Sequence, residues 1–181
     1  SDLQMELDGM TLSPGGNTLN FSLAAAAFGA KVSFYGAMGD DPFGSFLRRW
    51  MEKLGVKDHS RKLKGVQTST TIAIPNMSGE RRLLTHPGAN SKFLIKPEKI
   101  DLDWSSHVHC GGFWFTKKMA DGGIEEIFRK CREMNIQTSL DPASPPFGFR
   151  GKLAKRFEET LPYVDILFVN THELNKISGT R

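Results

Sequence analysis

The chain has 181 residues, 39% hydrophobic and 24% charged, which is ordinary for a single globular domain with its own core. Its net charge of +4 is not concentrated in a basic run with interleaved aromatics, so nucleic acid is not an expected partner. No apolar stretch reaches membrane-spanning length and the first residues carry no secretion signal. We therefore expect a cytoplasmic protein without a membrane partner, whose Cys110 and Cys131 are reduced thiols.

Helical and strand-like patterns alternate in the first part of the chain. Residues 20–28 are rich in alanine and predict a helix that Gly29 ends. Residues 32–35 predict a strand. Residues 42–54 predict an amphipathic helix, because their large apolar side chains recur at spacings of three and four.

The pattern then changes to that of an antiparallel hairpin. Residues 68–74 are rich in β-branched side chains, residues 76–79 form a turn signal, and residues 81–86 can return as the second strand. The opening residues 3–12 can add one or two strands to the same small sheet. We expect these segments, about 3–13 and 67–87, to form a lid within one domain.

The alternation resumes in the second half of the chain. Strands are predicted at residues 107–110, 137–140 and 166–169, and helices at 124–134, 152–161 and 171–178. Short apolar strands separated by helices predict an α/β fold with a doubly wound, mostly parallel sheet. The last predicted helix begins just before Arg181, so we expect further chain or a partner to cover the sheet edge there.

Paired glycines precede the first helix. Gly15 and Gly16 have no Cβ and can let a backbone approach a ligand closely, while the following helix points free N–H groups at its start. Asn20 can cap the helix or bind a ligand hydroxyl. A tight turn followed by a capping asparagine is the simpler alternative. The motifs GxxxxGK[ST] and GxGxxG after a strand are both absent, which argues against a P-loop or a dinucleotide site.

The spacing of this segment resembles the first signature of the PfkB/ribokinase family of carbohydrate kinases. The resemblance runs through the glycine pair, an asparagine, a small residue and two later glycines: Gly15-Gly16, Asn20-x-Ser22, Gly29 and Gly39. Thr18 departs from it, since the family usually has Gly, Ala or Pro there.

Four further segments resemble the family in the same order along the chain. They are Gly39-Asp40-Asp41-x-Phe43-Gly44, Gly79-Glu80-Arg81-Arg82 with His86-Pro87-Gly88-Ala89-Asn90, Asp141-Pro142, and Asn170-Thr171-His172-Glu173. Each is weak alone, but five motifs in order over almost the whole chain identify it as similar to this family.

The resemblance implies a ribokinase-like fold in which a sugar or nucleoside lies between the α/β body and a β-sheet lid. The implied activity transfers the γ-phosphoryl of ATP to a substrate hydroxyl. By resemblance, Gly15, Gly16 and Asn20 contact the substrate, Asn170 approaches the nucleotide, and Glu173 helps to hold Mg²⁺ through water. The alternative for the last two is a capping box at a helix start, and both roles can hold at once.

Two other groups of polar residues have plainer explanations. Gly39 and Asp40 belong to a turn at the start of a helix, which favours a structural role. His107 and His109 share one face of a predicted strand while Cys110 points the other way. No carboxylate cluster is near them in sequence, so strand-end polar residues are favoured over a metal site.

The second family signature, Asp-Thr-x-Gly-Ala-Gly-Asp, does not occur in this sequence. By resemblance it supplies the anion hole and the catalytic base, so no catalytic residue is assigned here and the catalytic Asp is expected beyond Arg181. Residues 1–181 are then expected to be the amino-terminal part of one kinase domain, inactive alone. The alternative is a non-catalytic ligand-binding or assembly module built on half of the kinase fold. Lid strands in this family often pair across a dimer, so a homodimer is also expected.

Overall fold

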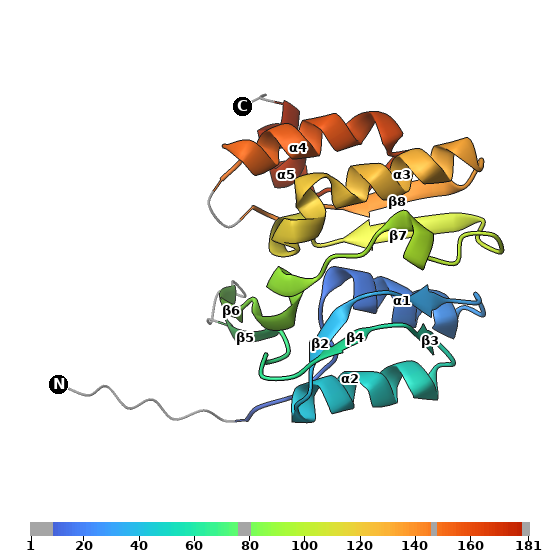
Figure 1. The fold of residues 1–181 in the computed structure, drawn as a ribbon. Helices are drawn as coiled ribbons and strands as arrows, with labels where there is room; N and C mark the ends of the chain where they lie inside the picture. The colour runs from blue at the N-terminus through green and yellow to red at the C-terminus, as the bar shows by residue number, and fades with distance from the viewer. Residues whose placement is uncertain (1–8, 76–80, 146–147, 179–181) are drawn as a thin grey trace.

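The computed structural model describes residues 9–75, 81–145 and 148–178, drawn in colour in Figure 1. Five α-helices are described, at α1 (Asn17–Ala27), α2 (Pro42–Lys53), α3 (Ile124–Glu133), α4 (Lys152–Thr160) and α5 (Thr171–Ser178). They alternate with short strands at β1 (Ser33–Phe34), β2 (Ala37–Gly39), β3 (Lys57–Asp58), β4 (Arg61–Leu63), β7 (His107–Gly111), β8 (Gln137–Asp141) and β9 (Ile166–Leu167).

These strands pair in parallel, as the alternating pattern predicts. β1 pairs with β3, β2 pairs with β4, and β8 lies between β7 and β9. Helix α1 contacts β7 on one face, where Phe21 stacks on His109, and α3 packs on β7 and β8 through the main core on the other. Helices on both faces of the parallel β7–β8–β9 sheet confirm the predicted doubly wound architecture.

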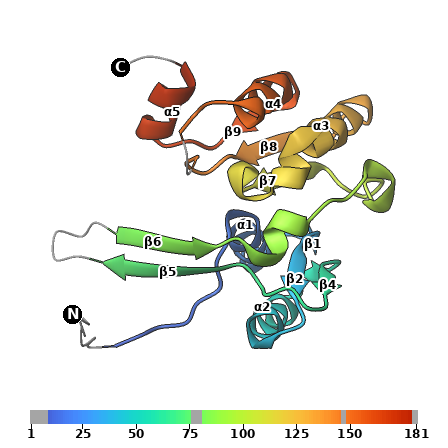
Figure 2. The same cartoon turned by 60° about the vertical axis from the view of Figure 1, so that its left-hand side comes forward.

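The lid is an antiparallel hairpin of β5 (Thr70–Pro75) and β6 (Arg81–His86), which projects from the body in Figure 2. Its register pairs Thr70 with His86 and Pro75 with Arg81, so the predicted pair of strands is confirmed. The predicted turn at 76–79 lies outside the described residues. Of the predicted lid segment 3–13, residues 9–13 form no strand and the remainder also lies outside the described residues.

Helix α1 begins at Asn17, three residues before the predicted start, and its N-cap is Gly16 with φ +94°. Glycine reaches this left-handed conformation without a Cβ clash, so the chain turns into the helix there. Asn20 therefore lies inside the first turn, and its backbone N–H donates to Gly16 O at 2.9 Å. The prediction that Asn20 can act as a cap is wrong, because Gly16 already holds that position.

The turn before α2 has the structural role expected of it. Asp41 caps the helix by accepting from Gly44 N at 2.8 Å, and it also accepts from Thr68 N at 2.6 Å and Thr68 Oγ1 at 2.7 Å. A Cβ at Gly39 would lie 2.4 Å from Val66 O, so this close approach requires glycine. The network ties the start of α2 to the segment that leads into the lid.

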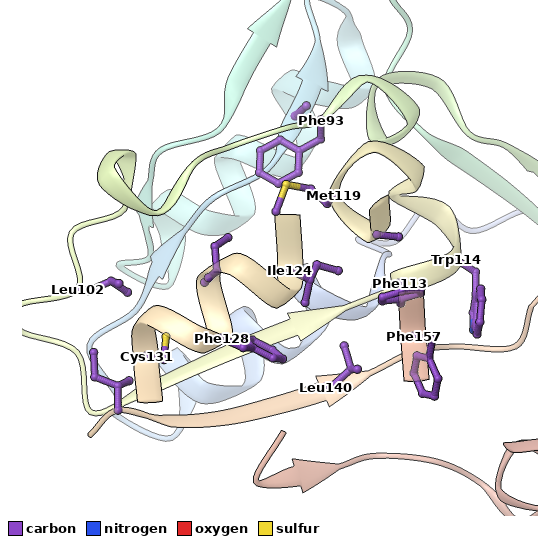
Figure 3. Close-up of a cluster of buried hydrophobic side chains, with 14 of the residues drawn as sticks. Phe93, Leu102, Phe113, Trp114, Met119, Ile124, Phe128, Cys131, Leu140 and Phe157 are labelled. Carbon is purple, nitrogen blue, oxygen red and sulfur yellow. The ribbon is translucent and has the colours of Figure 1, made fainter. Parts of the chain in front are cut away.

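Two hydrophobic clusters hold the layers together. The larger one lies between the β7–β8 strands and helices α3 and α4, with Phe113, Phe128 and Phe157 fully buried (Figure 3). Complete burial of one such side chain contributes about 1.5–3 kcal/mol. The smaller cluster joins α1, α2 and β1–β2 through Leu19, Leu23, Phe34, Met38, Met51 and Val56. None of the described helices is long and apolar enough to cross a membrane.

Candidate active site

An open cleft of about 1800 Å³ runs between the start of α1, the lid, the carboxyl ends of β7 and β8, and the start of α5. All residues predicted to bind substrate, nucleotide or metal line it: Gly15, Gly16, Asn20, Asn170 and Glu173. Clefts at the carboxyl ends of parallel strands are the usual ligand sites of open α/β sheets. Segments more than 150 residues apart in sequence thus meet at one site.

The glycine turn presents bare backbone to this cleft. A Cβ built at Gly15 or Gly16 would meet no atom within 4 Å, so packing against the protein does not require glycine there. The positive φ of Gly16 does favour glycine, and the open space leaves room for a ligand against the backbone. Asn20 follows one turn into α1, exposed and on the cleft lining, so its amide is accessible to a polar ligand.

Thr18, the departure from the family signature, joins α1 to β7. Its hydroxyl donates to Gly111 O at 3.0 Å and accepts from Gly111 N at 2.9 Å. A Cβ at Gly111 would lie 2.7 Å from Thr18 N, so the missing side chain permits this approach. A Gly, Ala or Pro in place of Thr18 would lack the hydroxyl that makes both bonds.

Asn17 makes a second connection, which sequence reasoning missed. Its Nδ2 donates to Asp141 Oδ2 at 2.8 Å, and Asp141 Oδ1 accepts from Ala143 N at 3.0 Å. In the sequence, Asp141 stands out only as half of an Asp-Pro pair at a strand end. The sole signal for Asn17 was its position directly after the glycine pair, and its partner lies 124 residues away.

Asn170 and Glu173 form the capping box that was the alternative to a nucleotide role. Glu173 N donates to Asn170 Oδ1 at 2.9 Å, and Asn170 N donates to Glu173 Oε2 at 3.1 Å. Ser144 Oγ also donates to Glu173 Oε1 at 2.7 Å, and Glu173 is 8% exposed. The carboxylate is therefore held rigidly at the cleft, and the capping interpretation is confirmed.

This geometry fits a magnesium contact made through water. Each carboxylate oxygen of Glu173 accepts one hydrogen bond from the protein and has a second lone pair left for a water molecule. Mg²⁺ keeps several of its waters when it binds to proteins, so a contact of this kind suits the ion. Among the residues that the structure describes, no group of three or more His, Cys, Asp or Glu is arranged to hold a metal directly.

The histidines of β7 are linked to one hydroxyl. His107 Nε2 and His109 Nδ1 lie 2.7 Å and 2.8 Å from Ser139 Oγ, and the His109 ring stacks on Phe21 at 3.8 Å between centroids. Loss of hydration lowers the pKa of His109 to about 4, so the ring is neutral near pH 7. Loss of hydration likewise raises the pKa of Cys110 to about 12, which makes it an unreactive thiol.

The lid contributes mainly one of its two faces to the cleft. Thr71, Ala73, Arg81, Leu83 and Thr85 line the cleft, and they lie on the same side of the β5–β6 ribbon by its register. The other side carries Ile72, Ile74 and Leu84, together with the polar residues Thr70, Arg82 and His86. A ligand in the cleft would thus lie between the glycine turn and a mixed polar and apolar ribbon.

An open α/β body with a ligand cleft at its strand ends and a β-hairpin lid defines a class of proteins that enclose small molecules between body and lid. The chain belongs to the pfkB family of carbohydrate kinases, whose family model matches residues 1–181. This confirms the family inferred from the five motifs.

The sequence relatives include several fructokinases from plants. The chain is 24% identical over 182 residues to probable fructokinase-2 of Arabidopsis thaliana, covering 97% of this chain and 55% of that protein. It is 30% identical over 133 residues to a fructokinase of Solanum tuberosum, covering 73% of this chain and 39% of the relative. The chain thus spans about half the length of the curated relatives it matches.

Solved structures agree on the fold. A putative ribokinase II of E. coli matches with a TM-score of 0.81 at 18% identity, over 100% of this chain and 61% of its own. Fructokinase from Xylella fastidiosa matches with a TM-score of 0.75 at 24% identity, over 91% of this chain and 53% of the fructokinase chain. That fructokinase has also been solved with bound ATP. These likenesses confirm the ribokinase-like fold predicted from the sequence.

Proposed function

We propose that the protein to which these residues belong transfers the γ-phosphoryl group of ATP to a hydroxyl of a sugar, or of a nucleoside. The observation that carries this proposal is the single cleft that gathers the glycine turn, Asn20, Asn170 and Glu173 from opposite ends of the chain. Membership of a carbohydrate kinase family and structural neighbours solved with ATP or inosine support the same reaction class.

In this proposal the substrate lies against Gly15 and Gly16 and its hydroxyls bond to the Asn20 amide. A neutral amide both donates and accepts, which suits a polyol. The lid residues on the cleft side cover the bound substrate and exclude water. Exclusion of water matters because phosphoryl transfer to water would compete with transfer to the substrate.

The nucleotide lies at the start of α5, with its phosphates near Asn170. Magnesium neutralises phosphate charge when bound, and Glu173 would hold it through water. The anion hole and the base that accepts the hydroxyl proton are proposed to come from a segment of the protein after Arg181. The present residues then form a substrate wall, a lid and part of the nucleotide site.

The test is ATP-dependent phosphorylation of fructose, ribose and adenosine by two samples: residues 1–181 and the complete gene product. We expect turnover of about 1–100 s⁻¹ on one of these substrates by the complete product, and none by residues 1–181. Robust turnover by residues 1–181 would contradict the assignment of the base. Binding without turnover in both samples would instead favour the non-catalytic ligand-binding module.

A further inference from the structure

A short turn after β8 connects the two proposed ligand sites. It consists of residues 141–144, and it begins with Asp141 and the fully buried Pro142. Ala143 has φ +59°, a left-handed conformation that is uncommon for a residue with a Cβ. Such a conformation costs free energy and persists only where the surrounding contacts determine it.

One end of the turn is bonded to the glycine turn. Asp141 Oδ2 accepts from Asn17 Nδ2 at 2.8 Å, while Asp141 Oδ1 accepts from Ala143 N at 3.0 Å. The two carboxylate oxygens thus serve the start of α1 and the strained residue together. Both bonds have ordinary hydrogen-bond lengths, so Asp141 joins the start of α1 to this turn.

The other end is bonded to the start of α5. Ser144 Oγ donates to Glu173 Oε1 at 2.7 Å, and Glu173 Oε2 accepts from Asn170 N. Glu173 is buried, and these two bonds hold its carboxylate at the cleft. A continuous path therefore runs from Asn17 through residues 141–144 to Glu173.

We propose that Asn17, Asp141 and Ser144 are positioning residues, which hold the glycine turn and the start of α5 in one fixed geometry. The inference rests on the proposed function, because it concerns how the substrate and the nucleotide are presented to each other. Reacting atoms must approach to about 3–3.5 Å, and a misplacement of about 1 Å can cost a hundredfold in rate. Loss of either link is expected to disturb both sites.

The first experiment requires no activity. Hydrogen exchange of backbone amides is measured in residues 1–181, comparing the segments 9–19 and 168–178. Asn17→Asp opposes two carboxylates and is expected to speed exchange in segment 9–19 about tenfold. The double variant Asn17→Asp with Asp141→Asn restores one donor and one acceptor. Its rate of hydrogen exchange in segment 9–19 is expected to return to near that of the unsubstituted chain. If hydrogen exchange in segment 9–19 is no slower in the double variant than in Asn17→Asp alone, the pairing of Asn17 with Asp141 is overturned.

Ser144→Ala tests whether the two ends are connected. It is expected to speed exchange about fivefold in segment 168–178 and also in segment 9–19, on the far side of the turn. Ser91→Ala is the matched control, because Ser91 Oγ donates to Gly88 O at the same 2.7 Å but lies outside the path. A Ser144→Ala effect confined to segment 168–178 would overturn the coupling.

Kinetics of the complete gene product supply the second readout. Asn17→Asp, which lies in the substrate turn, is expected to raise the KM for MgATP severalfold as well as that for the sugar or nucleoside. Ser144→Ala is expected to raise both as well, and Ser91→Ala neither. Variants that each change only the KM of the adjacent ligand would overturn the proposal. Absence of turnover in the unsubstituted product would contradict the proposed function, while hydrogen exchange would still decide the coupling.

Discussion

Asp41 shows how one carboxylate can join two parts of the chain. Burial by itself would raise its pKa, but the hydrogen bonds from Gly44 and Thr68 outweigh that effect and hold the pKa below its ordinary value of 3.8. The charged form is therefore favoured in the folded protein. Its contribution to stability is present above about pH 4 and is lost as the pH falls through the lowered pKa.

Asp41→Ala is expected to lower the free energy of unfolding by about 2 kcal/mol near pH 7, because it removes a helix cap and the bonds to Thr68. Asp40→Ala is the control. The exposed Asp40 pairs with Lys62 at 2.7 Å, and an exposed pair contributes about 1 kcal/mol or less. Urea unfolding of both variants measures the difference, and equal losses would contradict the capping role.

His109 is expected to make the free energy of unfolding depend on pH. Its pKa of about 4 is set first by lost hydration, while nearby Asp141 raises it and His107 lowers it further. The unfolded chain takes up a proton near pH 6.5 that the folded ring does not accept until about pH 4. The unfolded state therefore binds more protons in this window, and stability falls as the pH is lowered.

Replacement of His109 by Gln removes this titration. Thermal unfolding from pH 7 to pH 4 is expected to show a smaller loss of Tm for His109→Gln than for the unsubstituted chain. His86→Gln is the control, since His86 is exposed on the lid. A pH dependence of Tm that is identical in His109→Gln and the unsubstituted chain would show that His109 titrates normally.

At the scale of elements, one face of the lid hairpin has an apolar patch, next to Arg82, without a partner in the described part of the chain. Ile72 and Leu84 lie opposite each other in the register, and each is 59% exposed. Ile74 continues the same side, facing away from the cleft. Exposed apolar faces of this kind commonly mark protein–protein contacts, which supports the expectation that two lids pair in a homodimer.

Leu84→Lys is expected to convert such a dimer to a monomer, because it places a charge in the apolar contact. Light scattering over a range of concentrations measures the mass. Thr71→Lys, on the opposite side of the ribbon, is the control and is expected to leave the dimer intact. A monomeric mass for the unsubstituted protein at high concentration would contradict the dimer.

The boundaries of helices and strands were predicted well where the hydrophobic pattern extends over at least six residues. The helices α2, α3, α4 and α5 and both lid strands begin and end within two residues of their predicted bounds. The strands β2, β3 and β4, of three, two and three residues, are not predicted from the sequence, because such short strands show no periodicity. The sequence predicts the start of α1 at residue 20, later than the observed Asn17, because a glycine cap leaves no side-chain signal at Gly16.

At the scale of the whole molecule, the sequence alone determined the family, the fold class and five residues that line the cleft. Helix and strand periods and local motifs depend on neighbours in the chain, so they are visible without a structure. Gly15, Gly16, Asn20, Asn170 and Glu173 all followed from such motifs, and all line the same cleft.

Only the tertiary structure decided how these motifs are joined. The bonds from Asn17 to Asp141, from Thr18 to Gly111 and from Ser144 to Glu173 span 124, 93 and 29 residues of sequence. A hydrogen bond requires its two atoms to meet within about 3 Å, and no local pattern records which distant atom will be there. That meeting depends on how the sheet and its covering helices pack, so the path between the proposed substrate and nucleotide sites became visible only in the folded chain.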